Sequence, residues 1–130
     1  MLKLTYTDVG LHTERVFVDP EVLIAQRAIL ALRLGQTLHL EPGKAAFLLP
    51  ATVSAFNQLS AIAQRESHLG LTITPVDDDY VEISLYGSWL ACGANAHEGT
   101  FLAVLSVSAE YWVHKLWQET QIPLSNWTNG

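Results

Sequence analysis

Alternating apolar and polar residues predict two strands at the start of the chain. In LKLTYT (residues 2–7) every second residue is apolar, which is the pattern of a strand with one buried face. The turn residues DVG follow, and LHTERVFV (residues 11–18) predicts a second strand. We therefore expect an N-terminal β-hairpin.

The stretch DPEVLIAQRAILALRLG predicts a helix over residues 20–34. Asp19 suits the cap position, Pro20 the first helical turn and Gly35 the end. Two apolar stripes cover most of the helix and leave only a narrow polar face. The first stripe is Val22, Ala25, Ile29 and Leu32, and the second is Leu23, Leu30 and Leu34. The polar face consists of Gln26, Arg27 and Arg33. Such a helix is typically buried on more than one side, so we expect it at the centre of the domain or at a subunit interface.

Further patterns predict the remaining elements. The predicted strands cover 36–41, 45–50, 70–76, 80–92 and 100–107, and the predicted helices cover 52–66 and 108–120. Turns are expected at 42–43 and 77–79, Ser108 is the candidate cap of the last helix, and the tail after it is expected to be irregular. The order indicates one α+β domain over residues 1–130, a mainly antiparallel sheet with about three helices packed on it.

Charge changes this picture in two ways. Charged residues make up 15% of the 130 residues, where about 25% is usual. With so few charges on a small domain, we expect a second subunit to cover part of the surface. The net charge of −6 disfavours nucleic-acid binding, which depends on clustered lysine and arginine.

The cellular setting is predicted from what the sequence lacks. A single cysteine forms no internal disulfide, and the first residues, MLKLTYTDVG, do not have the pattern of a signal peptide. The longest apolar stretch, within 22–35, is too short and too charged to span a bilayer. We expect a cytoplasmic protein that does not bind membranes.

The stretch ACGANAHEG (residues 91–99) brings a thiol, an imidazole and a carboxylate close in sequence. Cys92 with His97 is a weak candidate for a thiol active site, with Glu98 or Asn95 as an orienting group. No motif supports activation of the thiol, so we interpret the stretch as a loop between strands, with Cys92 as a small buried residue. The histidines are too dispersed to predict a metal site, and no glycine-rich phosphate loop is present, so we expect no cofactor.

Aromatic residues are the other candidate chemistry. Trp112 fits the apolar stripe of the last predicted helix, Trp117 lies at the edge of that stripe, and Trp127 lies in the tail. Partly buried aromatic side chains at the edge of a domain are typical of interface anchors, and packing beneath the tail is the alternative. The candidates for a ligand site or an interface are Tyr80, Tyr86, Trp89, Trp112, Trp117 and Trp127.

The opening segment MLKLTYTDVGLHTERVFVDPE resembles small uncharacterised proteins of cyanobacteria. The resemblance implies a cytoplasmic α+β domain without an assigned activity. It transfers no catalytic residue to this chain.

Three functions follow in order of preference. The first is a non-enzymatic module that forms homodimers or higher oligomers, or binds another protein, through helix 20–34 or the last helix and its tail. The second is binding of a small apolar ligand between sheet and helices, lined by Tyr80, Tyr86, Trp89 and Trp117. The third is a thiol enzyme that uses Cys92 and His97.

Overall fold

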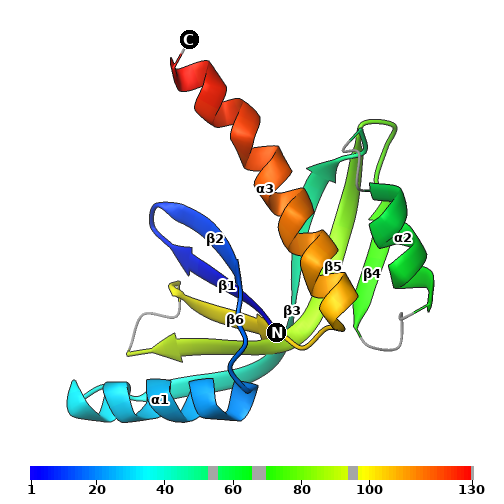
Figure 1. Cartoon of the computed structure of the whole chain (residues 1–130). Helices are drawn as coiled ribbons and strands as arrows, with labels where there is room; N and C mark the ends of the chain where they lie inside the picture. Colours follow the sequence, from blue (N-terminus) through cyan, green and yellow to red (C-terminus); the bar gives the residue numbers. More distant parts are fainter. Residues whose placement is uncertain (53–55, 66–69, 94–96, 130) are drawn as a thin grey trace. The chain divides into compact units, whose positions relative to one another are not determined.

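The computed structural model describes residues 1–52, 56–65, 70–93 and 97–129, with side chains up to residue 120. Six strands of an antiparallel sheet and three helices confirm the α+β class (Figure 1). The elements are β1 Leu2–Thr7, β2 Gly10–Arg15, α1 Pro20–Arg33, β3 Leu38–Pro50, α2 Phe56–Arg65, β4 Leu71–Pro75, β5 Tyr80–Cys92, β6 Gly99–Ala103 and α3 Val107–Asn129.

The chain forms two compact units. The first contains residues 1–45 and 86–104, and the second contains 46–85 and 105–130. Strands β3 and β5 are long enough to contribute to both units. For this reason the single domain expected over 1–130 stays a prediction.

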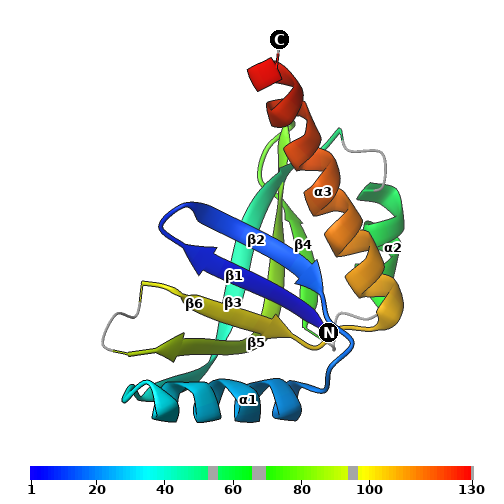
Figure 2. The ribbon, with the colours of Figure 1, turned by 60° about the vertical axis from the view of Figure 1, so that its left-hand side comes forward.

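The first unit is built on the predicted hairpin. Strand β1 pairs antiparallel with β2 on one side and with β6 on the other, and β6 pairs with the end of β5. Helix α1 runs alongside the end of β5 (Figures 1 and 2). The hydrophobic residues buried in this unit are Leu2, Leu4, Ala31, Leu90, Ala91, Phe101, Leu102 and Ala103.

The second unit packs α2 and α3 with β4 and the first half of β5. The turn between these strands is the predicted 77–79, where one carboxylate oxygen of Asp77 accepts hydrogen bonds from the amides of Asp79 and Tyr80, each 2.8 Å long. Phe47 of β3 meets Trp117 of α3 edge to face, with ring centroids 5.6 Å apart. The buried hydrophobic residues are Leu49, Leu59, Ile62, Ala63, Leu71, Val81, Ile83, Leu85, Leu105, Ala109, Val113 and Leu116.

Two predicted interruptions of regular secondary structure are wrong. The expected turn at 42–43 lies inside β3, a continuous strand at one end of the strand order. An end strand tolerates a proline because some of its amides have no strand partner, so Pro42 does not break it. The expected irregular tail is also wrong, because α3 continues to Asn129. A helix that packing has already nucleated propagates with one hydrogen bond per added residue.

The boundary between the last strand and helix also differs from the prediction. Strand β6 ends at Ala103, so the apolar residues after it belong to the connection and to the start of α3. The hydroxyl of Ser106, and not that of Ser108, caps the helix by accepting a hydrogen bond of 3.1 Å from the amide of Ala109. The prediction relied on the run of apolar residues alone and therefore placed the end of the strand too far along the sequence.

Helix α1 has the predicted bounds but not the predicted burial. Asp19 occupies the cap position without a side-chain cap bond, and Gly35 follows the helix with a φ of +69°. Only Ala31 is buried, whereas Ile29 and Leu32 of the first stripe are 52% and 79% exposed. The expectation of a helix central in the domain is therefore wrong, and a subunit interface is the expectation that stays open.

Candidate functional site

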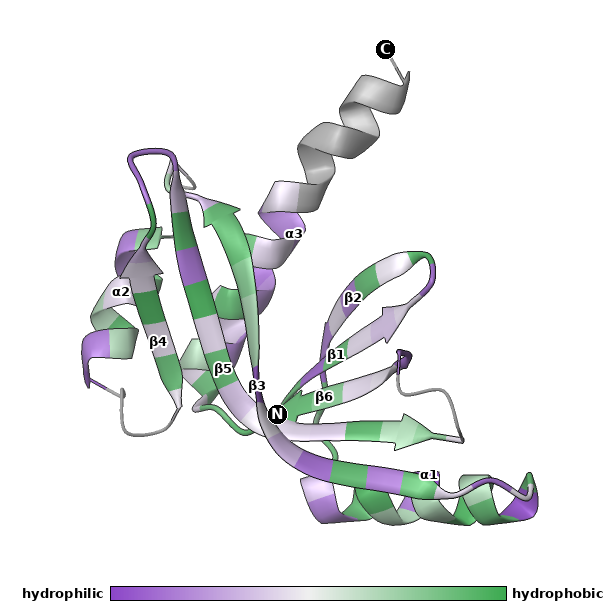
Figure 3. Cartoon of the chain, turned by 180° about the vertical axis from the view of Figure 1, so that it is seen from behind, coloured by the Kyte–Doolittle hydropathy of each residue, from purple (hydrophilic) through white to green (hydrophobic). Residues whose placement is uncertain are grey.

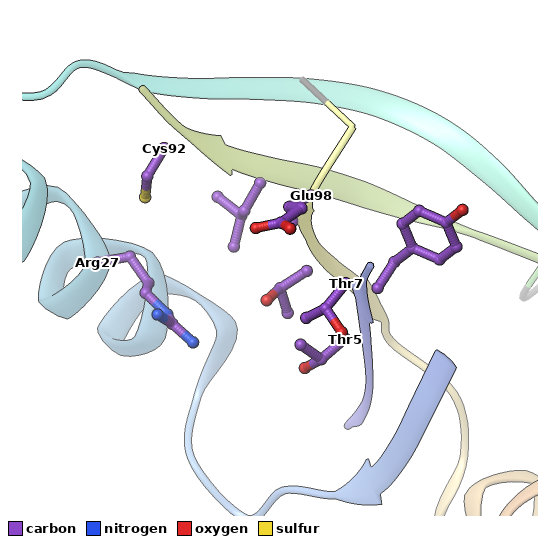
Figure 4. Close-up of a pocket in the computed structure, with 9 residues that line it drawn as sticks. Thr5, Thr7, Arg27, Cys92 and Glu98 are labelled. Atoms are coloured by element: carbon purple, nitrogen blue, oxygen red, sulfur yellow. The ribbon is translucent and has the colours of Figure 1, made fainter. Parts of the chain in front are cut away.

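A pocket of about 210 Å³ lies in the first unit, with lining residues from α1 and from three strands or their ends (Figure 4). Its wall combines hydroxyl, guanidinium, carboxyl and thiol groups with apolar surface. The lining residues are Thr5, Tyr6, Thr7, Arg27, Leu90, Cys92, Glu98, Gly99 and Thr100.

The strand register explains why the sheet side of this pocket is polar. Thr5 lies opposite Thr100 across the β1–β6 pair, and Thr100 lies opposite Leu90 across the β6–β5 pair. Opposed residues share a face of the sheet, and Thr7 joins the same face because it is two residues from Thr5. Leu2 and Leu4 point to the other face, where they are buried. The alternation of β1 therefore supplies one apolar face and one row of hydroxyl groups.

The same face continues into an ion pair. Lys3 lies opposite Glu14 in the β1–β2 register, and the Lys3 ammonium is 3.0 Å from a carboxylate oxygen of Glu14. This hydrogen bond and the positive charge of Lys3 hold the pKa of Glu14 below its ordinary value, and the charges of His12 and Arg27 add to the effect. The positive field of Arg27 thus reaches the sheet face that carries the pocket.

Arg27 is the only charged residue that α1 contributes to the described lining of the pocket. It lies one turn before Ala31, the buried residue of the helix, and is itself half-buried. Its side chain extends from α1 towards Thr5 (Figure 4). Within the part of the chain that the structure describes, no hydrogen bond or ion pair joins the guanidinium to a protein group. The sequence pattern assigned Arg27 to the polar, solvent-facing side of the helix, whereas in the structure its side chain points towards the sheet.

Glu98 is the acidic group of the pocket. Its pKa is raised above the ordinary value of 4.5, first because it shares a hydrogen bond with the Asp8 carboxyl and then because the negative charge of Asp8 repels its own. Asp8 lies in the turn that connects β1 and β2. Glu98 therefore holds its proton more readily than an ordinary glutamate does.

Replacing Asp8 by asparagine should lower the pKa of Glu98 towards its ordinary range. A raised folded-state pKa gives stability that is present below the unfolded value and is lost as pH rises through the folded value. The Asp8→Asn variant should therefore gain stability over the wild type at neutral pH and lose that advantage at acidic pH. An NMR titration of the Glu98 carboxyl carbon, with melting curves at both pH values, measures this. An unchanged Glu98 titration would show that the two carboxyls do not interact.

The structure brings two of the three candidate thiol-site residues to this pocket. Cys92 and Glu98 line it, whereas His97 is exposed and is not part of its described lining. No group of three metal-ligating side chains is found in the described residues. Sequence reasoning missed Thr5, Thr7, Arg27 and Thr100 as lining residues, and the row of threonines in β1 was the available signal.

The aromatic candidates do not gather in this pocket. Tyr80 and Tyr86 are 45% and 55% exposed, and Trp89 and Trp117 are half-buried. The side chain of Trp127 lies outside the described residues.

Trp112 is half-buried and is not a core residue of α3. It contacts the Tyr111 ring edge to face at 5.0 Å, and the Lys115 ammonium lies 5.0 Å from its ring centroid. The other three residues of the predicted apolar stripe, Ala109, Val113 and Leu116, are buried, so the half-buried Trp112 lies at the margin of this core.

A second pocket of about 290 Å³ lies in the second unit, between α2 and β4. Its described lining has no charged side chain: it consists of Ser60, Ala63, Gln64, Leu71, Thr72 and Ile73. This second pocket offers only a few neutral polar groups. The first pocket therefore has the wider range of chemical groups.

These features define a small α+β protein with a pocket that carries a basic and an acidic side chain beside an exposed apolar helix. A family model described as Alr0857-like matches residues 1–121, and the chain belongs to this family. Alr0857 is a cyanobacterial locus name, which confirms the resemblance seen in the opening segment. Comparison with curated proteins and with solved structures finds no match. Among the described residues, no helix is long and apolar enough to cross a membrane.

Proposed function

We propose that this protein is a non-enzymatic module that associates with a second copy of itself through α1. The observation that carries the proposal is the exposed apolar stripe of this helix. Val22, Ile29 and Leu32 are 48%, 52% and 79% exposed, and Ala25 is exposed between them. Hydrophobic residues run along most of α1 in Figure 3.

The spacing of the stripe suits a helix pair. Its residues lie three, four and three positions apart, which is the spacing of the contact positions in coiled coils. At 3.6 residues per turn they span about 80° of the helix circumference. Exposed Gln26 and Arg33 flank one side of the stripe and exposed Glu21 the other. The result is a narrow apolar seam with polar edges, and we call these four residues the α1 seam.

An antiparallel arrangement fits the sizes of the side chains in the α1 seam. A two-fold axis midway along the seam places Val22 of one copy against Leu32 of the other, and Ala25 against Ile29. Each layer then joins a smaller side chain to a larger one, which fills space evenly. A parallel pair would place Ala25 against Ala25 and leave that layer underfilled. Antiparallel helices also bring the positive end of each dipole beside the negative end of the other.

Further apolar residues lie at both ends of the seam. Phe17, three residues before α1, is 87% exposed, and Leu34, directly after α1, is 63% exposed. An antiparallel pair brings the start of one helix beside the end of the other, so these two residues come within reach of each other. This addition matters because a 14-residue helix is only about 21 Å long, while a stable interface buries roughly 800 Å² on each partner.

Sedimentation equilibrium of the purified chain over a wide concentration range tests the proposal. We expect a monomer–dimer equilibrium that Ile29→Glu weakens by at least about 100-fold in Kd, because each dimer would bury two unpaired carboxylates in place of two apolar side chains. Leu30→Glu is the matched control. Leu30 is 45% exposed on the same helix but lies away from the seam, and the change adds the same charge.

The outcome against the proposal is equally specific. A chain that stays monomeric at about 0.5 mM, where even weak dimers form, contradicts it. An equal effect of the two glutamate variants also contradicts it, because it would show a dependence on net charge and not on the seam. Circular dichroism of both variants confirms that they fold before the comparison is made.

A further inference from the structure

We propose that the pocket beside α1 binds a small zwitterion, a molecule that carries one carboxylate and one ammonium group, such as an amino acid. The pocket volume of about 210 Å³ is below the roughly 300–1,000 Å³ that is usual for drug-sized ligands. This volume suits a small molecule of the size of an amino acid.

The Arg27 side of the pocket suits the carboxylate. An arginine guanidinium matches a carboxylate through two parallel hydrogen bonds, and it is less strongly hydrated than a lysine ammonium. Arg27 makes no hydrogen bond or ion pair with any protein group that the structure describes, and it extends towards the hydroxyl-bearing strand β1. Thr5 and Thr100, opposed on that sheet face, offer two hydroxyl donors for the remaining carboxylate lone pairs.

The Glu98 side of the pocket suits the ammonium. Glu98 lines the pocket, and a hydrogen bond with the nearby Asp8 carboxyl and the negative charge of Asp8 raise the pKa of Glu98. An ammonium group has three donors and a full positive charge, so it pairs with Glu98 and offsets the repulsion from Asp8. The hydroxyl of Thr7, which also lines the pocket, accepts a hydrogen bond of 3.3 Å from the amide of Val9 and keeps a second lone pair for an ammonium donor.

The opposite charges in one pocket favour a zwitterion over a simpler ion. A plain anion at Arg27 leaves the Glu98 carboxylate without a cation, and a plain cation at Glu98 leaves the Arg27 guanidinium without an anion. A zwitterion meets an opposite charge at each end. Figure 4 shows Arg27 and Glu98 bordering the same space, Arg27 from α1 and Glu98 from the position directly before β6. The assignment requires no reaction at Cys92, which only borders the cavity.

NMR titration of the ¹⁵N-labelled full chain tests the proposal with defined probes. The zwitterions are glycine, L-alanine, L-serine, β-alanine and γ-aminobutyrate, which vary the separation of the two charges and the size of the side chain. Acetate and methylamine provide each charge alone. We expect at least one zwitterion to shift the amide signals of Thr5, Thr7 and Thr100 with an affinity about tenfold or more above that of acetate or methylamine.

Variants separate the two ends of the ligand. Arg27→Gln and Glu98→Gln should each weaken binding of the best zwitterion by about tenfold or more. Arg33→Gln should leave it unchanged, because Arg33 is exposed on the α1 seam side of the helix. The spectra themselves report whether each variant is folded.

Three results would overturn the assignment. One is the absence of shifts for every zwitterion at about 50 mM, a concentration that reveals even very weak sites. Another is binding of acetate or methylamine as tight as that of the best zwitterion. The third is an equal loss of binding in Arg27→Gln and Arg33→Gln, which would indicate an effect of net charge alone.

Discussion

Replacing Gly87 by alanine should lower the melting temperature by about 10 °C or more, although the change adds only one methyl group. Gly87 lies in β5 opposite Ala103 of β6. A Cβ atom at this position would overlap the carbonyl oxygen of Leu102 and come within 2.8 Å of its carbonyl carbon. It would also lie 3.0 Å from the Phe101 ring. Because backbone atoms must move, the strand pair shifts or separates, and we expect a loss of about 3 kcal/mol or more.

Gly43→Ala is the matched control for this prediction. Gly43 lies in β3, and the nearest heavy atom to an added Cβ is in the Phe101 ring at 4.0 Å, an ordinary contact distance. This alanine should be neutral or slightly stabilising, since it reduces the conformational entropy of the unfolded chain. Thermal unfolding followed by circular dichroism compares the two variants. Equal melting temperatures would show that β5 and β6 approach less closely than the structure has them.

The sequence predicted the positions of the strands and helices better than it predicted which residues pack against them. The alternation of residues 2–7 identified β1 and its hairpin because a strand with one buried face has a period of two. Gly87 did not reveal its role, because the neighbour that requires glycine, Leu102, is fifteen residues away in sequence. Pro42 misled the prediction for the converse reason, since the same residue ends an inner strand and is tolerated in an end strand.

Helix α1 shows why the candidate site was harder to predict than the fold. Its polar residues were expected to face water and its stripes to face protein, which is the usual orientation of an amphipathic helix. In the structure Arg27 borders the pocket, and Ile29 and Leu32 are exposed. Periodicity shows that a helix has two kinds of surface, but it does not show which surface docks on the chain. That choice depends on the polar sheet face beneath, which only the strand register defines.

The two proposals use different sides of α1, so each can fail without the other. The α1 seam is exposed, whereas Arg27 turns towards the sheet. Ile29→Glu should therefore weaken self-association and leave zwitterion binding intact, while Arg27→Gln should do the reverse. Joint loss of both properties in either variant would indicate that the helix itself had been displaced.

Replacing Leu59 by alanine should destabilise the second unit by about 2–5 kcal/mol, the usual cost of such a change in a core. Leu59 is fully buried on the face of α2 that also carries Ile62 and Ala63. Its removal leaves a cavity that a ten-residue helix has few other contacts to compensate. Asn57→Ala, an exposed change two residues earlier, should be neutral, because alanine also favours the helix. Urea unfolding of the two variants measures the difference, and a cost below about 1 kcal/mol for Leu59→Ala would mean that α2 is not part of a packed core.

Amide exchange of the same Leu59→Ala variant decides whether residues 1–130 behave as the single expected domain. Strand β5 supplies Val81 and Ile83 to the core of the second unit and Leu90 to that of the first. A chain whose two cores share one strand should open both together, so we expect faster exchange in β1 and β6 as well as in α2. Faster exchange in α2 alone would show that the units open independently. The α1 seam and the pocket, both in the first unit, would then retain their structure when the second unit is destabilised.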